Sequence, residues 1–330
     1  MAKSTDLFHI LVPVWGREYT RSFLDYLVAS LLAEGNLPAW PYCGNTLLQI
    51  ATRQEDALQM EASPVFQRLR HYLPVQFQIF DLTQFGYLQG SSVFEAKQAI
   101  LQQIMAQLFV LAMDASAHVI PLMGDTLLAN GFFSYLCQVF NAETRLLLMA
   151  GPRLAPTAQG RLAPLKQNGV LALSPHQLNH WVFEQLHPHE AACFMDAPLF
   201  SQWPSHVYYW ETPRQIRSHW FHLHPFFLYR PQVARQARSV ALEMELLEQY
   251  ATQPDTIGVV QQSETAACSL ASDAEDMPAW GRESSLSERQ EMLVQFGQKN
   301  CFPLQRWLFK HPILFYLAES EAVLSQTRSD

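Results

Sequence analysis

Closely spaced cysteine pairs and long apolar runs are missing from this sequence of 330 residues. Its five cysteines include no Cys-x-x-Cys pair, so the sequence predicts neither a disulfide framework nor a cysteine zinc knuckle. The best candidate for a membrane span, residues 100–113, is too short and contains three glutamines. The first apolar run, residues 7–15, has no basic lead and no small-residue cleavage site, so a signal peptide is not expected. We therefore expect reduced thiols and a cytoplasmic location.

An excess of positive charge is missing too. The formal net charge is -8 at pH 7, and nothing in it favours a general affinity for phosphate backbones. We expect neither nucleic acid nor an anionic membrane as a partner. The hydrophobic fraction of 49% is enough for a substantial core, which suits one large domain or a domain with a sizeable extension.

Two glycine-rich phosphate-binding motifs are also absent. The sequence contains neither Gly-x-Gly-x-x-Gly nor Gly-x-x-x-x-Gly-Lys-Ser/Thr. These absences argue against classical dinucleotide binding and against P-loop nucleotide hydrolysis.

The first 150 residues alternate between short apolar runs and segments with helical spacing. Strands are expected at residues 8–14, 46–52, 75–81, 118–123 and 145–150, and helices at 19–33, from 54 onward, at 92–112 and at 127–140. Ser92 and Glu95 would form the capping box of the long helix. This alternation predicts an open, mostly parallel, Rossmann-like α/β sheet flanked by helices.

The second half is less regular, and we expect an irregular C-terminal α+β extension over residues 231–330. Ser174 and Pro175 should open a helix that runs to about residue 186. Aromatic-rich strands are expected at 207–210 and 217–229. Residues 261–287 are polar and short-sided, which predicts an exposed loop, and a terminal helical region should begin at Ser287.

Ligands of open α/β sheets bind beyond the carboxyl ends of the strands. That rule selects a small set of residues in the loops after the first four strands: Trp15, Gly16, Thr52, Arg53, Asp81, Gly124 and Asp125. We expect these loops to meet at one edge of the sheet.

Short motifs in this half of the chain follow one another in a suggestive order. They are Ile10-Leu-Val-Pro-Val-Trp-Gly16, Asn36-Leu-Pro38, Leu48-Gln-Ile-Ala-Thr52, Ala117-His-Val-Ile-Pro-Leu-Met-Gly-Asp125 with Asn130-Gly131, and Trp220-Phe-His-Leu-His-Pro225. Together they resemble bacterial GT-A-type glycosyltransferase-like proteins of the nucleotide-diphospho-sugar transferase superfamily. The resemblance spans about residues 8–230 and implies a GT-A-like nucleotide-sugar domain over residues 1–230.

The resemblance implies a nucleotide-diphosphate sugar donor and transfer of its sugar to a glycan or protein acceptor. In such enzymes an Asp-x-Asp pair holds a divalent metal, Mn²⁺ or Mg²⁺, that neutralises the leaving diphosphate. Carried over to this sequence, Asp125 would be the remaining acid of that pair, and His222 or His224 the distal metal ligand. Trp15, Gly16, Thr52 and Arg53 would hold the nucleotide, and Lys97 would reach the donor.

The sequence departs from that pattern at the acid itself. Met123-Gly-Asp-Thr126 has no second acid two residues away, and a lone carboxylate holds Mg²⁺ or Mn²⁺ weakly. Either the site works without a tightly held metal, or catalysis has been lost and the chain is a non-catalytic binding module. Asp196, Glu211 and Glu190 are candidates for the catalytic base.

Simpler explanations stand beside each of these assignments. Asp125 could merely cap a helix. His222 and His224 could lie on one face of a single strand, where two histidines could bind the metal ion of a metal-dependent hydrolase, or they could belong to a hydrogen-bonded aromatic patch. The group His187, His189, Glu190 and Cys193 matches no zinc signature and is explained by a helix start with solvated histidines. Lys97 could be a solvated helix residue.

Three aromatic side chains remain as candidates for contacts with a sugar: Trp203, Tyr208 and Trp210.

Overall fold

The computed structural model describes residues 6–85, 93–140, 143–231, 254–271 and 281–319. Its centre is a seven-stranded sheet with the order β12-β6-β11-β4-β1-β2-β3. These strands are β1 (Phe8–Pro13), β2 (Thr46–Thr52), β3 (Val75–Ile79), β4 (His118–Pro121), β6 (Leu146–Met149), β11 (His224–Leu228) and β12 (Ile257–Val259).

The sheet is mostly parallel. β1 pairs in parallel with β2 and β4, β2 with β3, and β6 with β12. Only β11, among the described strands of this sheet, runs antiparallel to its neighbours β4 and β6. The expected open, mostly parallel α/β sheet is therefore confirmed.

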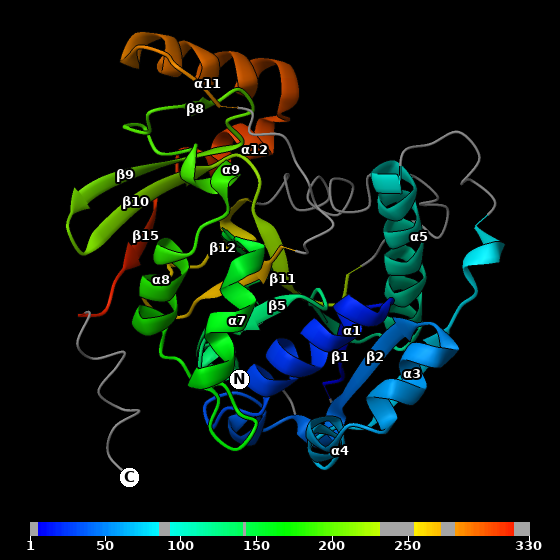
Figure 1. Cartoon of the computed structure of the whole chain (residues 1–330). Helices are drawn as coiled ribbons and strands as arrows, with labels where there is room; N and C mark the ends of the chain where they lie inside the picture. The colour runs from blue at the N-terminus through cyan, green and yellow to red at the C-terminus, as the bar shows by residue number, and fades with distance from the viewer. Residues whose placement is uncertain (1–5, 86–92, 141–142, 232–253, 272–280, 320–330) are drawn as a thin grey trace.

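Different elements cover the two faces of this sheet. All six residues of β1 are buried, and Ile10 points to one face while Leu11 points to the other. On the Ile10 side pack the first helical segment, α3, α4 and α6, and on the Leu11 side packs the long helix α5. Figure 1 shows α5 on one side of the sheet and the α1, α3 and α4 helices on the other.

The helices have the following bounds. The first helical segment consists of α1 (Arg17–Ser22), the π-helical η1 (Phe23–Val28) and α2 (Ala29–Leu31), and it is followed by α3 (Gln54–Glu61), α4 (Pro64–Arg70), α5 (Val93–Asp114), α6 (Phe132–Val139), α7 (Gln159–Leu162), α8 (Pro175–Glu184), α9 (Pro188–Ala191), α11 (Leu286–Asn300) and α12 (Pro303–Leu308). Short 3₁₀ turns are η2 (Leu37–Ala39), η3 (Cys43–Asn45), η4 (Leu82–Gln84), η6 (Pro156–Ala158), η7 (Ala163–Leu165) and η8 (Pro254–Thr256).

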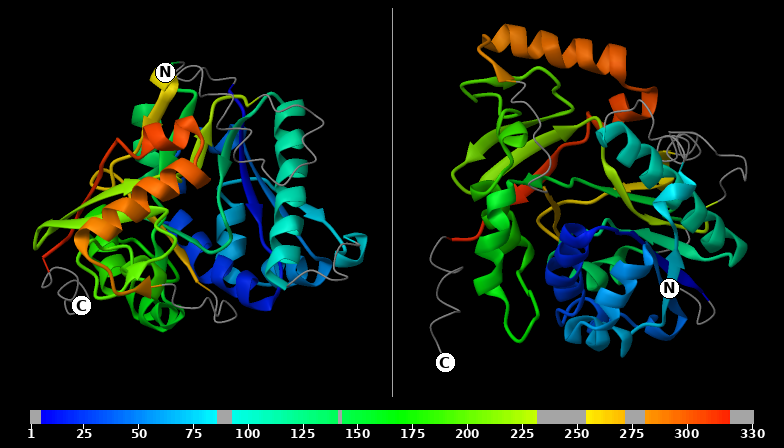
Figure 2. Two further views of the ribbon diagram at one scale, coloured as in Figure 1. Left: turned by 90° about the horizontal axis from the view of Figure 1, so that it is seen from above. Right: turned by 45° about the vertical axis from the view of Figure 1, so that its right-hand side comes forward.

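Three smaller sheets occur within the described ranges. One is made of β5 (Thr126–Leu128), β13 (Ala267–Leu270) and β7 (Arg153–Leu154); a second of β15 (Ile313–Tyr316), β10 (Gln215–Trp220) and β9 (His206–Thr212); and the third of β14 (Gly281–Arg282) and β8 (Phe200–Ser201). The views in Figures 1 and 2 agree that α11 lies at one end of the molecule, beyond β9 and β10, and that α3 and α4 lie at the other.

The helix expected at residues 127–140 is wrong in its first part. Residues Thr126–Leu128 form strand β5, and helix α6 begins only at Phe132, after Gly131 in a left-handed conformation with φ 104°. Asp125 therefore precedes a strand and caps no helix. The simplest structural explanation for this acid is removed.

The long strand expected at residues 217–229 is wrong too. β10 ends at Trp220 in one sheet and β11 begins at His224 in another. His222 therefore lies between two strands, and the expectation that it shares one strand face with His224 does not hold.

The expected exposed loop at residues 261–287 is wrong in its central described part, whereas residues 261–266 and 283–285 are loop. Residues Ala267–Leu270 form β13, the middle strand of a sheet, and Cys268 is only 2% exposed. Because this apolar stretch is short and polar residues surround it, the composition of the segment did not predict that it is buried. β12 and β13 both lie beyond residue 230 and pair with strands from the first part of the chain. The expected division into a domain over residues 1–230 and an extension over residues 231–330 stays a prediction.

The helix caps were predicted with mixed success. Ser174 and Gln177 form the capping box of α8, which confirms the expected start of that helix. The terminal helix was expected to begin at Ser287, and α11 begins one residue earlier, at Leu286, with a capping box that joins Ser285 and Glu288. Ser92 lies outside the described residues. None of the helices in the described ranges is both long and apolar enough to cross a bilayer.

Candidate functional site

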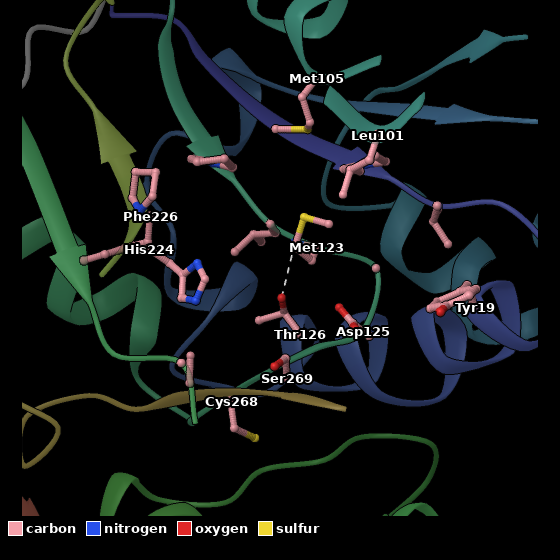
Figure 3. A pocket seen from close by; sticks show the side chains of 18 of the residues that line it. Tyr19, Leu101, Met105, Met123, Asp125, Thr126, His224, Phe226, Cys268 and Ser269 are labelled. Carbon is pink, nitrogen blue, oxygen red and sulfur yellow. Dashed lines mark hydrogen bonds between the residues drawn. The ribbon is translucent and has the colours of Figure 1, made fainter. Parts of the chain in front are cut away.

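A pocket of about 570 Å³ lies beyond the carboxyl ends of β1 and β4. Its lining comes from parts of the chain that are far apart in sequence. They are the loop after β1 with the start of α1, helix α5 from Lys97 to Phe109, the end of β4 with the following turn and β5, the start of α6, the segment from the end of β6 to β7, the start of β11, and strand β13. Figure 3 shows several of these side chains pointing into a common space. The location agrees with the rule for open α/β sheets.

The loops after β1 and β4 are in direct contact. A Cβ atom built on Gly124 would lie 2.8 Å from Cβ of Val14, so only glycine allows this approach without movement. The loops after β1 and β2 are joined by Asp56, whose Oδ2 accepts hydrogen bonds from the backbone N–H of Gly16 at 2.8 Å and from Nε of Arg53 at 2.7 Å. The loops after β1, β2 and β4 therefore meet at one edge, as expected, whereas Asp81 after β3 makes none of these contacts.

Asp56 was not among the residues selected from the sequence, although it organises this edge. Its side chain is buried and accepts hydrogen bonds from Gly16 and twice from Arg53. Gly16 has φ 88°, a left-handed conformation that favours glycine, so the turn after β1 is specified by both residues. The spacing of Arg53 and Asp56, three residues apart at a helix start, was the signal in the sequence.

Asp125 is half-buried at the pocket, in the turn that joins β4 to β5. The turn is closed by the Thr126 backbone N–H, which donates to the Met123 carbonyl at 3.0 Å, and by the Met123 N–H, which donates to Oγ1 of Thr126 at 3.2 Å. Burial raises the pKa of the Asp125 carboxyl above its ordinary value, and the positive charges of Arg153 and Lys97 oppose that rise. A raised pKa suits a carboxylate that accepts a proton.

Two cationic side chains line the same pocket. Lys97 comes from α5 and donates a hydrogen bond to the hydroxyl of Tyr19, with its Nζ 4.3 Å from the centre of the Tyr19 ring. Arg153 comes from β7 and is half-buried. Lys97 was expected as a site residue, whereas Arg153 was missed because its strand has only two residues and carries no apolar pattern.

Two hydroxyl groups lie beside these cations. Ser269 of β13 is paired with Thr126 of β5 on one side and with Arg153 of β7 on the other. All three residues line the pocket. Neither hydroxyl was selected from the sequence, since Ser269 falls in the segment expected to be a loop.

The rest of the lining is mainly apolar. It includes Leu101, Met105 and Phe109 from α5, Met123 after β4 and Phe226 from β11. Low polarity around the charged groups strengthens their interactions, because fewer water molecules screen them.

The two histidines expected as metal ligands have different positions. His224 lines the pocket, and its Cδ2 lies 3.0 Å from a Cβ atom built on Gly151, so the ring packs on that glycine. Figure 3 shows His224 and Asp125 on different sides of the view, with Thr126 and Ser269 between them. His222 does not line the pocket, and its ring contacts that of His224 edge to face at 5.4 Å.

A divalent metal does not fit the donor set of this pocket. Among the described residues of the lining, Asp125 is the sole carboxylate, and it lies within the influence of two cations, whereas Mg²⁺ and Mn²⁺ favour several oxygen ligands. Across the described residues, no group of three histidine, cysteine, aspartate or glutamate side chains is arranged to hold a metal ion. The metal requirement that the resemblance implies stays an untested prediction, and no step below depends on it.

The remaining expected site residues lie outside the lining. Thr52 is fully buried at the end of β2, and Arg53 pairs with Asp56 and with Glu55. Glu211 is on β9 in a separate sheet, paired with Arg217, and Asp196 is exposed. Asp81 is exposed and caps η4, its carboxylate accepting from the Thr83 N–H at 2.9 Å.

Glu190 belongs to a buried polar network instead. Its Oε2 accepts a hydrogen bond from the hydroxyl of Tyr208 at 2.9 Å. The same oxygen lies 3.1 Å from Nε2 of His206, and the two side chains form an ion pair without hydrogen-bond geometry. Burial lowers the pKa of His206, but neighbouring Cys193 and Glu190 outweigh burial and raise it to about 10. Burial also opposes ionisation of Glu190, yet His206 and Tyr208 leave its pKa below the ordinary value.

The neighbouring His187 confirms one expectation and contradicts another. It is the N-cap of α9, where its Nδ1 accepts from the His189 N–H at 3.2 Å, but its side chain is buried rather than solvated. Among the aromatic candidates, Tyr208 is fully buried, whereas Trp203 and Trp210 are exposed. Trp210 lines a second pocket of about 500 Å³ together with His180, Glu184 and Arg214.

Comparisons with known proteins give distant structural likenesses. No family model matches the chain, and no curated protein matches it. Mouse xyloside xylosyltransferase 1, in its apo form, has 13% sequence identity and a TM-score of 0.27, with 43% of this chain and 52% of that chain covered. A putative glucose-1-phosphate thymidylyltransferase from Bacillus anthracis, in complex with a sucrose, has 13% identity and a TM-score of 0.23, with 44% and 55% covered.

The alignment with a third solved structure covers more of both chains than the first two alignments do. The inositol-1-phosphate CTP transferase from T. maritima has 9% identity and a TM-score of 0.30, with 90% of this chain and 98% of that chain covered. This chain spans about half the length of the first two structures. Likenesses of this size leave the function to be argued from the geometry of the pocket.

Proposed function

We propose that this chain binds a nucleotide-diphosphate sugar in the pocket at the edge of its sheet and transfers the sugar to a glycan or protein acceptor. The supporting observation is that four residues selected from the sequence, Trp15, Lys97, Asp125 and His224, line one pocket although they come from four separate elements. Their position beyond parallel strand ends is where such folds bind ligands.

In this proposal each side chain has a defined task. Trp15, half-buried and packed edge to face on Phe80 at 5.6 Å, offers an aromatic surface to the nucleotide. Lys97 neutralises charge on the diphosphate. The acceptor hydroxyl attacks the sugar carbon, the bond from that carbon to the diphosphate oxygen breaks, and Asp125 takes the hydroxyl proton. Catalysis would consist of positioning, proton removal and charge stabilisation.

Binding and turnover separate this proposal from its rival. Calorimetric titration with a panel of uridine, guanosine, cytidine and thymidine diphosphate sugars, with and without Mn²⁺, identifies the donor. Asp125→Asn should keep the Kd for that donor within about threefold and lower the rate of donor hydrolysis or transfer by at least about 100-fold, the range of a general base. Asp81→Asn is the matched control, because Asp81 also follows a strand of the central sheet, β3, but lies outside the pocket.

A second candidate function is a non-catalytic module that binds the same class of ligand. It is favoured because the part of the lining that the structure describes holds one carboxylate, and a pocket with one acid has fewer means of proton transfer. Tight binding of a nucleotide sugar with no turnover by the intact chain would select the module. Failure of every nucleotide sugar to bind would contradict both functions.

A further inference from the structure

We propose that Thr126, Ser269 and Arg153 form a row that holds the phosphate groups of the ligand, completed by Lys97, and that this row replaces a bridging divalent cation. The identity of the ligand as a nucleotide sugar rests on the proposed function. The row itself rests on strand pairing, charge and the lining of the pocket.

The row follows from the register of the β5-β13-β7 sheet. Ser269 is the direct partner of Thr126 in the antiparallel pairing and of Arg153 in the parallel pairing. Directly paired residues of adjacent strands point to the same face of a sheet. All three line the pocket, and Figure 3 shows Ser269 on the side of β13 that carries Thr126, opposite to Cys268. Adjacent strands lie about 4.8 Å apart, which gives the row a length of about 10 Å, enough to contact more than one phosphoryl group.

The chemistry of the row suits an oxyanion. Each serine or threonine hydroxyl donates one hydrogen bond, and the guanidinium of Arg153 offers a planar set of donors that matches phosphate oxygens. Figure 3 shows Thr126 and Ser269 on the same side of the pocket as Asp125. Lys97 reaches the pocket from α5, so the cations come from two separate elements, β7 and α5.

The charge balance of the lining also favours an anion. Among the described residues of the lining, Lys97 and Arg153 are cations and Asp125 is a carboxylate, in a protein whose net charge is -8. Glu190, outside the lining, is also under the influence of Arg153. A locally cationic pocket in an acidic chain concentrates an anionic ligand there rather than over the whole surface. The apolar side chains of α5 that face this region reduce screening and strengthen each contact with a phosphate.

The direct test measures binding of inorganic pyrophosphate and of the donor by calorimetry, once in EDTA and once in Mn²⁺. Binding in EDTA should equal binding in Mn²⁺ within about twofold. Arg153→Met and Lys97→Met should each weaken binding of pyrophosphate by at least about 10-fold, the size expected for loss of one charged hydrogen-bonding partner. Ser269→Ala should weaken it by about three- to tenfold, and Arg153→Lys should restore part of the loss.

Arg145→Met is the matched control, because Arg145 is exposed, contacts the ring of Tyr229 and lies outside the pocket. Thermal unfolding of each variant shows whether it is folded. Donor binding that requires Mn²⁺ and ignores Arg153→Met would overturn the row and leave the proposed function intact. Binding of pyrophosphate on the row without binding of any nucleotide sugar would support the row and overturn the proposed function. Failure to bind pyrophosphate or any nucleotide would overturn both.

Discussion

Gly124 leaves no space for a side chain against Val14: a Cβ atom at position 124 would lie 2.8 Å from both Cβ and Cγ2 of the valine. Val14 is buried, so it cannot move aside into solvent. This contact holds the loop after β1 against the loop after β4, and these two loops carry Trp15 and Asp125.

Gly124→Ala should therefore destabilise the protein. The added methyl group overpacks a contact between two loops, and such changes cost about 1–3 kcal/mol. Urea denaturation measures the loss, and donor binding should weaken with it because Asp125 moves. Gly44→Ala is the control, since a Cβ atom there meets nothing within 4 Å. Equal stability of the two variants would show that the loops are not in contact.

Asp56→Ala should loosen the turn after β1. The substitution removes the acceptor of the Gly16 N–H and both hydrogen bonds from Arg53 to Asp56, so these half-buried donors lose that partner. The expected loss is about 1–3 kcal/mol in the free energy of unfolding. Glu55→Ala removes the other acidic partner of Arg53, which is exposed, and should change stability by less than about 1 kcal/mol. The prediction fails if Glu55→Ala costs as much as Asp56→Ala.

Asp125→Asn should make the fold more stable at neutral pH. Burial raises the pKa of Asp125 in the folded state, so the ionised carboxylate opposes folding above that pKa, and the amide removes the penalty. A gain of about 0.5–2 kcal/mol is the usual size of a stabilising substitution. The gain should shrink as the pH falls through the raised pKa toward the ordinary value of 3.8, as followed by urea denaturation. Asp81→Asn, where a hydrogen bond from Thr83 lowers the pKa, should give no gain.

The buried pair of Glu190 and His206 should give the protein an alkaline limit of stability. The folded-state pKa of His206 is raised to about 10, so its contribution is fully present below its ordinary value of 6.5 and is lost as the pH rises through about 10. The pKa of Glu190 is lowered, so its contribution is present above 4.5 and is lost only as the pH falls further. Thermal unfolding between pH 6 and pH 11 measures the upper limit.

Glu190→Gln tests the same pair by mutation. Breaking a buried ion pair on one side costs about 3–5 kcal/mol, because the remaining charge stays buried. Glu211 lies on β9, the strand that also carries His206, and forms an exposed ion pair with Arg217 of β10. Glu211→Gln breaks this pair and should cost less than about 1 kcal/mol. A flat stability profile above pH 7 in the unmodified protein would contradict the assignment of a buried charge to His206.

The sequence predicted the parts of the fold that depend on local pattern. β1 is a nearly continuous apolar run buried on both faces, and β2 has the expected bounds Thr46–Thr52, because such runs carry their own signal. The pocket residues that follow strand ends, Trp15 and Asp125, were found for the same reason. Their selection needed only the order of strands and the rule for sheet edges.

The parts that the sequence did not reveal depend on pairing between distant residues. β13 has four residues, and what makes it a central strand is its contact with β5 and β7, more than 110 residues earlier. Arg153 and Ser269 become a site only through that register. Likewise, Trp220 and His224 are close in sequence but fall in different sheets, and no local pattern marks the point where the chain crosses between them.

The position of β13 in the middle of its sheet has a consequence for synthesis. Until residues 267–270 leave the ribosome, β5 and β7 have no strand between them, and the wall that carries Thr126 and Arg153 is unfinished. A nascent chain can assemble β1, β2 and β4 much earlier, so its core precedes its pocket. We therefore expect the pocket wall to be completed only after this strand has been synthesised.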